Sequence, residues 1–300
     1  MQTLAVHPMD NFPVRPLTFD LEHVGIHDLV WSRTCPEFSV FMNALGLHIP
    51  HFERYLIHSL RLAKEQVQDA PLRRDISAII GQEAHHAKNF LLINQALAKR
   101  YPQVARHDAD AKQHFGDRAK NDSLKRLVGF TAGYETFTFL AGIIILQHHQ
   151  RWFENSEPVM KAVWIWHQVE EVEHGAVAFD VYKALYGKDE WYRKWMVLAA
   201  LTHIAGETIK TYVHMARIEG WLGTPFKAIK SLGFCASMLL RLLFSALPVF
   251  RKSYNPRSHP VVTSRQDPIQ IAWRRFERNG GDVLKIDHAK MAQIMGIGAA

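Results

Sequence analysis

Apolar side chains recur every three or four residues along four long segments of the chain, at 50–68, 72–100, 123–150 and 159–186. This spacing places them on one face of an α-helix, and each segment is long enough to form one wall of a bundle. The pattern breaks at 69–71, 101–122, 155–158 and 187–189. Between 50 and 219 there is no convincing run with the alternation typical of a strand. The sequence therefore predicts an all-α fold with a four-helix bundle over 50–186.

The chain on either side of the bundle is expected to complete a single domain over residues 1–300. Residues 1–30 contain several prolines and no sustained periodicity, so they predict an extended arm. Additional C-terminal helices are expected over 187–250. The tail at 251–300 is interrupted by prolines and predicts loops, with a short amphipathic piece around 269–276.

Residues 232–250 are unusually apolar, because Arg241 is the only charged residue among these nineteen. Nineteen residues lie at the lower limit of length for a helix that spans a bilayer. An arginine near the centre is costly in hydrocarbon, and basic residues flank the segment on both sides. These features favour a helix that is buried in protein or lies at a membrane interface over one that spans the membrane.

Glutamate and histidine side chains interrupt the apolar stripes near their middles, at Glu53, Glu83, His86, Glu135, Glu171 and His174. In chain order they form a glutamate, a Glu-x-x-His unit, a second glutamate and a second Glu-x-x-His unit, one group on each predicted helix. A buried charge without a partner is strongly destabilising. We therefore expect these side chains to bind metal ions, with a metal-free network of buried Glu–His pairs as the alternative.

This order of carboxylates and imidazoles resembles that of the ferritin-like di-metal carboxylate proteins. Four sequence runs are more specifically similar to the bacterial family described as predicted metal-dependent hydrolases. They are 51–55 (HFERY), 81–87 (GQEAHHA), 166–182 (WHQVEEVEHGAVAFDVY) and 255–260 (NPRSHP). The resemblance thus covers nearly the whole chain, and it implies a ferritin-like bundle extended by C-terminal helices.

The resemblance also implies a division of the ligands between two metal ions. Glu83 and Glu171 would bridge the ions, Glu53 and His86 would bind one of them, and Glu135 and His174 would bind the other. Mixed carboxylate and imidazole ligands suit iron or manganese, and open coordination positions suit reactions of iron with dioxygen. We expect two iron ions, with manganese or a mixed pair left open. Only two cysteines occur, which argues against a thiolate zinc site.

His167 lies four residues before Glu171 and seven before His174, so all three share one helical face. The resulting His-x-x-x-Glu-x-x-His pattern is similar to that of the arylamine N-oxygenases, di-iron enzymes with an additional histidine ligand. The position of His167 would bring it to the second metal ion, the one assigned to Glu135 and His174, and this resemblance implies that His167 is a seventh ligand. The alternative is a buried histidine that supports the ligands without binding metal.

Gln82 and Glu170 occupy matching positions, each directly before the glutamate of a Glu-x-x-His unit. We expect each of them to orient the histidine of the other helix, as the supporting hydrogen bonds of metal-bound imidazoles commonly do. The alternative is that Glu170 and Glu173 form a solvated face of the helix.

Thirty-six Lys and Arg against 29 Asp and Glu give a net charge of +7, which suits an anionic membrane surface or an acidic carrier protein as partner. No module that combines basic and aromatic residues is visible, so nucleic acid is not expected as a partner. The start of the chain shows no signal-peptide pattern. We expect a cytoplasmic protein. Peripheral attachment to the inner membrane and formation of a homodimer are further expectations.

The sequence lacks a Gly-x-Gly-x-x-Gly, a phosphate-binding loop, a His-Glu-x-x-His and a Gly-x-Ser-x-Gly motif. The expected function is that of a non-haem di-iron oxidase or oxygenase, which uses dioxygen and an electron donor to oxidise a small hydrophobic, acyl or amine substrate. N-oxygenation is one candidate reaction. A metal-dependent hydrolase that uses a metal-bridging hydroxide is the first alternative, and a non-catalytic metal-binding protein is the second.

Overall fold

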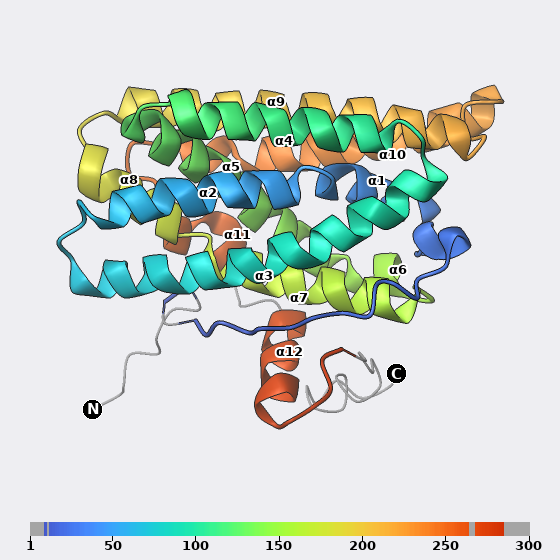
Figure 1. Ribbon diagram of the computed structural model, residues 1–300, viewed down its shortest axis with the longest axis horizontal. Coiled ribbons are helices and arrows are strands. Elements are labelled where there is room, and N and C mark those ends of the chain that lie inside the picture. Colours follow the sequence, from blue (N-terminus) through green and yellow to red (C-terminus); the bar gives the residue numbers. More distant parts are fainter. Residues whose placement is uncertain (1–8, 11, 264–267, 285–300) are drawn as a thin grey trace.

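The structure is a computed structural model that describes residues 9–10, 12–263 and 268–284 (Figure 1). Over these residues its regular structure is helical, apart from one isolated β-bridge between Ser32 and Ser156. The predicted all-α fold is therefore confirmed. Residues 1–8 and 11 of the predicted arm, and 264–267 and 285–300 of the predicted tail, lie outside the described residues.

The described chain forms α-helices and short 3₁₀-helices in the following order. The α-helices are α1 (Pro36–Gly46), α2 (Ile49–Lys64), α3 (Ala70–Arg100), α4 (Val104–Asn121), α5 (Leu124–Gln147), α6 (His149–Phe153), α7 (Pro158–His174), α8 (Val177–Tyr186), α9 (Glu190–Ile218), α10 (Pro225–Ser245), α11 (Pro260–Thr263) and α12 (Pro268–Arg278). The 3₁₀-helices are η1 (Ile26–Leu29), η2 (Leu247–Phe250) and η3 (Pro256–Ser258). The four predicted bundle segments correspond to α2, α3, α5 and α7, the last continuing into α8.

Side-chain caps fix the start of three of these bundle helices. The Asp69 carboxylate accepts a hydrogen bond from the backbone N–H of Leu72 at 2.7 Å, which caps α3. The Ser123 hydroxyl caps α5, and the Glu157 carboxylate caps α7. Each cap satisfies a backbone donor that the first helical turn leaves without an intrahelical partner.

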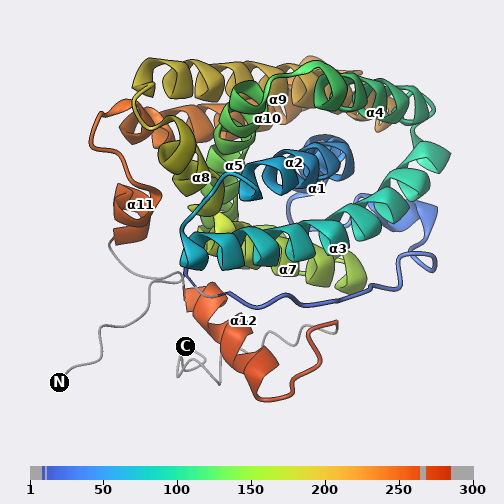
Figure 2. The ribbon, with the colours of Figure 1, turned by 60° about the vertical axis from the view of Figure 1, so that its left-hand side comes forward.

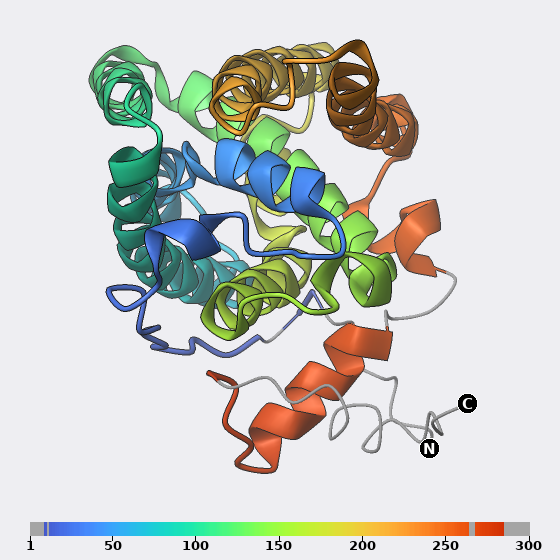
Figure 3. The same cartoon turned by 90° about the vertical axis from the view of Figure 1, so that its right-hand side faces the viewer.

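The helices are arranged in layers that all three ribbon views show (Figures 1, 2 and 3). Helices α3 and α7 form the lower layer, α2 and α5 lie above them, and α4, α9 and α10 cover the top. Helix α2 packs against α3 and α5, and α7 packs against α5 and α3, so the four helices enclose a common interior. Short α1 packs beneath α9 and α10.

The N-terminal arm runs along the outer side of α3 and α7, as Figure 1 shows. The backbone N–H of Phe19 donates to Asn89 Oδ1 at 3.1 Å, and the Gln82 side chain donates to the Pro13 carbonyl at 2.8 Å. The arm is free of helix over its described residues up to 25, but Ile26–Leu29 form the 3₁₀-helix η1 within the extended arm predicted over 1–30.

Two regions differ from the predicted helix pattern. Most of the predicted break at 101–122 is helix α4, which buries a narrow stripe consisting of Val104, His107, Ala111 and Phe115. The charged residues around this stripe conceal its periodicity in the sequence. The predicted helix at 159–186 is interrupted after His174, where a Cβ atom on Gly175 would lie 2.7 Å from Phe139 Cβ. Glycine here permits the close approach of α5.

Two helices are long and apolar enough to cross a membrane, but they differ in burial. Helix α5 lies in the bundle, and 94% of its most apolar window is buried. The segment Pro225–Phe250, which contains α10, has only 28% of its window buried. The apolar segment at 232–250 thus lies mostly on the surface of the described structure.

A substitution at Gly133 tests how tightly α5 packs against α9. A Cβ atom at this position would lie 2.6 Å from the Met196 carbonyl oxygen. We expect Gly133→Ala to lower the free energy of unfolding by about 1–3 kcal/mol, since backbone must move to admit the methyl group. Chemical denaturation followed by circular dichroism measures the change.

Gly116→Ala is the matched control, because a Cβ atom at this position of α4 meets no atom within 4 Å. This substitution should raise the free energy of unfolding by about 0.5–1 kcal/mol through helix propensity. Equal effects of the two substitutions would contradict the close packing of α5 on α9.

Candidate metal centre

Three bundle helices bring buried carboxylates and imidazoles together in the interior. Glu53 comes from α2, Glu83 and His86 from α3, and the remaining three residues, His167, Glu171 and His174, from α7. Their donor atoms form two overlapping groups within 4.8 Å, one of Glu53, His86, His167 and Glu171 and the other of Glu83, His86, Glu171 and His174. Every member is buried, and His86 and Glu171 belong to both groups. His167 joins the group of Glu53 rather than that of His174, with which the sequence predicts it to bind metal.

His86 lies at the centre of the cluster. Its Nδ1 atom is 3.3 Å from Glu83 Oε2, 3.6 Å from Glu53 Oε1 and 3.7 Å from Glu171 Oε1. Glu171 is common to both groups, as the resemblance implies for a bridging carboxylate. Glu83 belongs to only one of them, so its implied bridging position differs from the arrangement seen here.

Several donor atoms in the cluster approach each other without forming hydrogen bonds. His167 Nε2 lies 3.1 Å from Glu171 Oε1, and His174 Nε2 lies 3.1 Å from Glu83 Oε1, but neither contact is aligned as a hydrogen bond. Within the described residues, the buried cluster atoms without a hydrogen-bond partner are Glu53 Oε1 and Oε2, Glu83 Oε1, Glu171 Oε2, His167 Nε2 and His174 Nε2.

Unpartnered buried lone pairs of this kind are costly unless a further group satisfies them. Metal ions fit, because a cation between the donors would bind lone pairs that now face one another. The donor set of carboxylates and imidazoles suits iron or manganese. Among the described residues both cysteines, Cys35 and Cys235, lie outside these groups.

Glu135 on α5 contacts the cluster through His174 and does not join the converging donor atoms, whereas the resemblance implies that it binds a metal ion directly. Its Oε2 atom is hydrogen-bonded to His174 Nδ1 at 2.8 Å, and it belongs to neither group of converging donors. The Nε2 atom of the same His174 ring faces Glu83. In this geometry Glu135 orients a candidate ligand, and direct coordination would require its carboxylate to replace that hydrogen bond.

Burial and mutual charge shift the protonation of the cluster. Burial raises the pKa of Glu53 to about 7 and the pKa of Glu135 to about 8. Burial alone would lower the pKa of His174, but the charges of Glu171, Glu83 and Glu135 raise it to about 10. Burial alone would raise the pKa of Glu171, but the neighbouring imidazoles hold it well below its usual range. Without metal, the cluster therefore retains protons at neutral pH.

A second layer of buried ion pairs supports the His86 ring. His86 Nε2 donates to Glu170 Oε2 at 2.9 Å, which directs Nδ1 into the cluster. Arg15 from the N-terminal arm donates to Glu170 at 2.9 Å and to Glu173 at 2.8 Å, and Arg274 from α12 donates to Glu173 at 2.6 Å. Such contacts fix the ring orientation of a ligating imidazole.

Glu170 thus lies where we expected it, against the histidine of the other Glu-x-x-His helix, and it is fully buried. Gln82 differs from the prediction, because its amide donates to the Pro13 carbonyl and to Glu173 Oε2. No hydrogen bond joins Gln82 to His174 among the described contacts. The physical reason is that the arm covers this side of α3 and supplies a nearer acceptor.

Arg15, Glu173 and Arg274 were not predicted as part of the site. Arg15 lies 155 residues from Glu170 in the sequence, in an arm without periodicity. No local spacing therefore connects it to the Glu-x-x-His units. The alternation Glu-Val-Glu at 171–173 offered the only local signal for Glu173.

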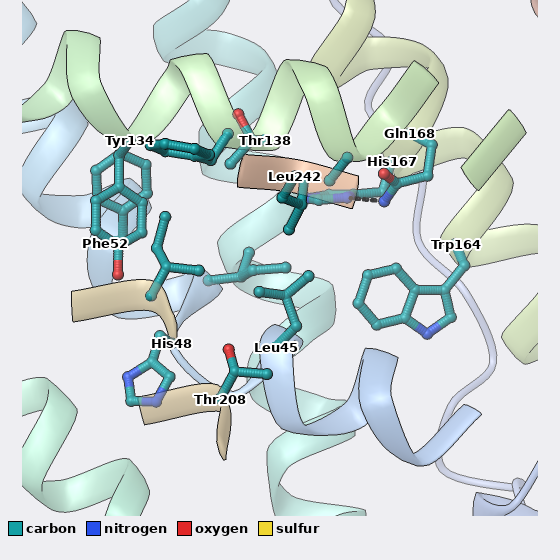
Figure 4. Close-up of a pocket in the computed structure, with 14 residues that line it drawn as sticks. Leu45, His48, Phe52, Tyr134, Thr138, Trp164, His167, Gln168, Thr208 and Leu242 are labelled. Atoms are coloured by element: carbon teal, nitrogen blue, oxygen red, sulfur yellow. Dashed lines mark hydrogen bonds between the residues drawn. The ribbon is translucent and has the colours of Figure 1, made fainter. Parts of the chain in front are cut away.

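An apolar pocket adjoins the cluster at His167 (Figure 4). His167 and Gln168 lie at one end, where the Gln168 side chain is hydrogen-bonded to His167 Nδ1 at 2.9 Å. His48 and Thr208 lie at the other end. The walls between them are largely apolar and include Leu45, Ile49, Phe52, Ala141, Trp164 and Leu242.

The fold and the cluster define a helical protein with a buried candidate metal-binding site. Residues 13–260 match the family described as "Predicted metal-dependent hydrolase", and the chain belongs to this family. Comparison with curated proteins gives no significant match, and comparison with solved structures gives none. The likeness to ferritin-like proteins and to arylamine N-oxygenases thus stays a prediction.

Replacing Glu171, which is common to both donor groups, tests the candidate ligands. We expect Glu171→Gln to lower the metal content of reconstituted protein from about two ions per chain to fewer than one. Elemental analysis after gel filtration measures it. His85→Ala is the matched control, since His85 neighbours His86 but is outside both groups, and it should retain its metal. Retention of two tightly bound ions by Glu171→Gln would refute the ligand assignment.

The raised pKa of His174, about 10, predicts that protons compete with metal. A protonated imidazole cannot bind a metal ion, so binding at neutral pH must release this proton. Affinity should therefore rise between pH 6 and pH 8, by about tenfold per pH unit for each proton released. Competition of the protein with a chelator of known affinity measures this dependence. An affinity that is constant over this range would contradict the proton-bearing cluster.

Proposed function

We propose that the chain is a non-haem di-iron oxidoreductase that uses dioxygen to oxidise a hydrophobic organic substrate. The observation that carries the proposal is that one residue, His167, belongs both to the converging donor cluster and to the lining of the apolar pocket. A substrate in this pocket would lie beside a candidate metal ligand.

The chain's own residues would hold the ions and exclude water. Glu53, His86, His167 and Glu171 would form one group of ligands, and Glu83 and His174 would complete the second with the shared residues. Bound iron would supply electrons for the reduction of dioxygen. The apolar walls of the pocket favour substrates with an apolar body and disfavour water.

The end of the pocket opposite His167 carries polar groups that need a partner. Neither ring nitrogen of His48 forms a hydrogen bond, and the Thr208 hydroxyl forms none, although all three groups are buried within the described structure. Burial lowers the pKa of His48 well below its usual value, so its neutral ring can donate one hydrogen bond and accept another. The Glu207 carboxylate, 3.9 Å from His48 Nε2, is too distant to satisfy it.

These groups favour an amphipathic substrate. A polar group on the substrate would satisfy His48 and Thr208, and an apolar body would fill the space towards His167. Acyl compounds and amines with an apolar chain have this character, and both belong to the classes that the sequence favours.

Hydrolysis is the second candidate, and the description of the family favours it. The same ligands could hold ions that act as Lewis acids at a constant oxidation state. The two reactions differ in their need for dioxygen and for a redox-active metal.

Oxygen consumption separates the two candidates. Protein reconstituted with ferrous iron without oxygen should consume dioxygen on mixing and develop new visible absorption, and zinc-loaded protein should do neither. A Clark electrode and stopped-flow absorption measure these changes. Glu171→Gln, exposed to the same ferrous iron and then desalted, is the control for iron that reacts outside the site.

The opposite result would favour the hydrolase. Two bound irons that do not react with dioxygen, together with cleavage of ester or amide substrates by the zinc or manganese form, would overturn the oxidoreductase proposal. Oxygen consumption at the same rate by Glu171→Gln would place the reaction outside the cluster and would also overturn it.

A further inference from the structure

Helix α10 has two apolar faces, of which the bundle covers only one. Its inner face consists of the buried residues Ser231, Cys235, Met238 and Leu242. Its outer face carries exposed large apolar side chains and continues into η2. We define this outer face by Phe226, Ile229, Leu232, Leu240, Phe244 and Leu247.

The side chains of this outer face are far more exposed than large apolar side chains usually are in a soluble protein. Phe226 is 80% exposed, Phe244 is 64% exposed and Leu247 is 57% exposed. A contiguous apolar surface of this kind marks an interaction site. Helix α10 lies along the bundle, with α9 and α1 packed against it (Figures 1 and 3). We call its outer apolar face the ridge.

The charged residues of the segment that carries the ridge are all basic. Residues 225–252 contain five basic residues and no aspartate or glutamate. The basic residues are all exposed, and they are Lys227, Lys230, Arg241, Arg251 and Lys252. One of them, Lys230, forms an ion pair with Glu37 of α1 at 2.7 Å. Exposed apolar residues flanked by cations are typical of helices that lie in a membrane interface.

This pattern favours a lipid surface over a second copy of the chain. A two-fold dimer would place the same face on both sides of the contact and so would bring like charges together. Anionic headgroups would instead complement the cations, and acyl chains would accept the phenylalanine rings. A spanning arrangement is disfavoured, since Met238 and Leu242 hold α10 against the bundle and Arg241 would enter hydrocarbon.

We propose that the outer face of α10 docks the protein on an anionic lipid surface, with Phe226, Phe244 and Leu247 among the acyl chains and the flanking cations at the headgroups. Leu242 on the inner face of the same helix lines the pocket. Docking would therefore bring the pocket within one helix diameter of the lipid. That consequence for substrate supply rests on the proposed function, whereas the docking itself does not.

Vesicle flotation with the full-length protein tests the proposal. The protein should float with phosphatidylcholine vesicles that contain phosphatidylglycerol, and much less with phosphatidylcholine alone. Added sodium chloride should weaken flotation, because salt screens the attraction of cations to headgroups. The double variant Phe226→Ser, Phe244→Ser should reduce the partition coefficient by at least about tenfold.

Leu62→Ser is the matched control, because Leu62 is an exposed apolar residue of α2, 43% exposed, outside the ridge. It should float like the wild type. Glu171→Gln should also float like the wild type, so that a failure of the metal chemistry leaves the docking result intact. Circular dichroism verifies that each variant is folded.

Four results would overturn the proposal. The first is absence of flotation with either lipid, and the second is unchanged flotation of the double phenylalanine variant. The third is a dimer in analytical ultracentrifugation that the double variant dissociates, which would assign the ridge to a second copy. Binding to polyglutamate without binding to vesicles would assign it to an acidic protein and would equally refute the lipid surface.

Discussion

The fold is constrained above all by the carboxylates and imidazoles that its four central helices enclose. Glu53, Glu83, His86, Glu171 and His174 each occupy a position that an apolar side chain would fill in an ordinary bundle core, and each is at most 2% exposed. Isolated charges at such depth are unstable, so each group must be balanced by another charge, a proton or a cation. The raised pKa values of Glu53 and His174 show protons in this balancing role. Metal ions bound by the same side chains would replace these protons.

The same need for charge balance attaches the ends of the chain to the bundle. Glu170 and Glu173 are fully buried on α7, and Arg15 from the arm and Arg274 from α12 neutralise them. Loss of one partner from a buried pair of this kind costs about 3–5 kcal/mol, because the other charge remains buried. The arm and α12 therefore close the layer of α3 and α7, and Arg15 of the arm holds His86 through Glu170. The two ends of the chain, which lie outside the predicted bundle segments, thereby support the cluster.

Local spacing accounts for what the sequence predicted well. The helices at α2, α3, α5 and α7 and the position of each Glu-x-x-His unit follow from a period of three to four residues, which is a property of one helix at a time. The contact of Glu170 with His86 also follows from matching positions on two facing helices. The narrow stripe of α4 escaped detection because only four of the 18 residues of this helix are buried, and one of these four is His107.

Contacts between distant segments account for what the sequence could not show. Gln82 has the same place in its motif as Glu170, but the Pro13 carbonyl lies within its reach and His174 is hydrogen-bonded to Glu135 instead. Burial of the two most apolar helical segments also depends on contacts between distant parts of the chain. Helix α5 has a mean hydropathy of 1.4 and is enclosed by the bundle. The Pro225–Phe250 segment has a mean hydropathy of 1.8 and lies mostly exposed. Hydropathy therefore ranks them in the wrong order for burial. What decides burial is the number of sides that neighbours cover, and α10 has the bundle on one side only, where Leu242 closes the pocket.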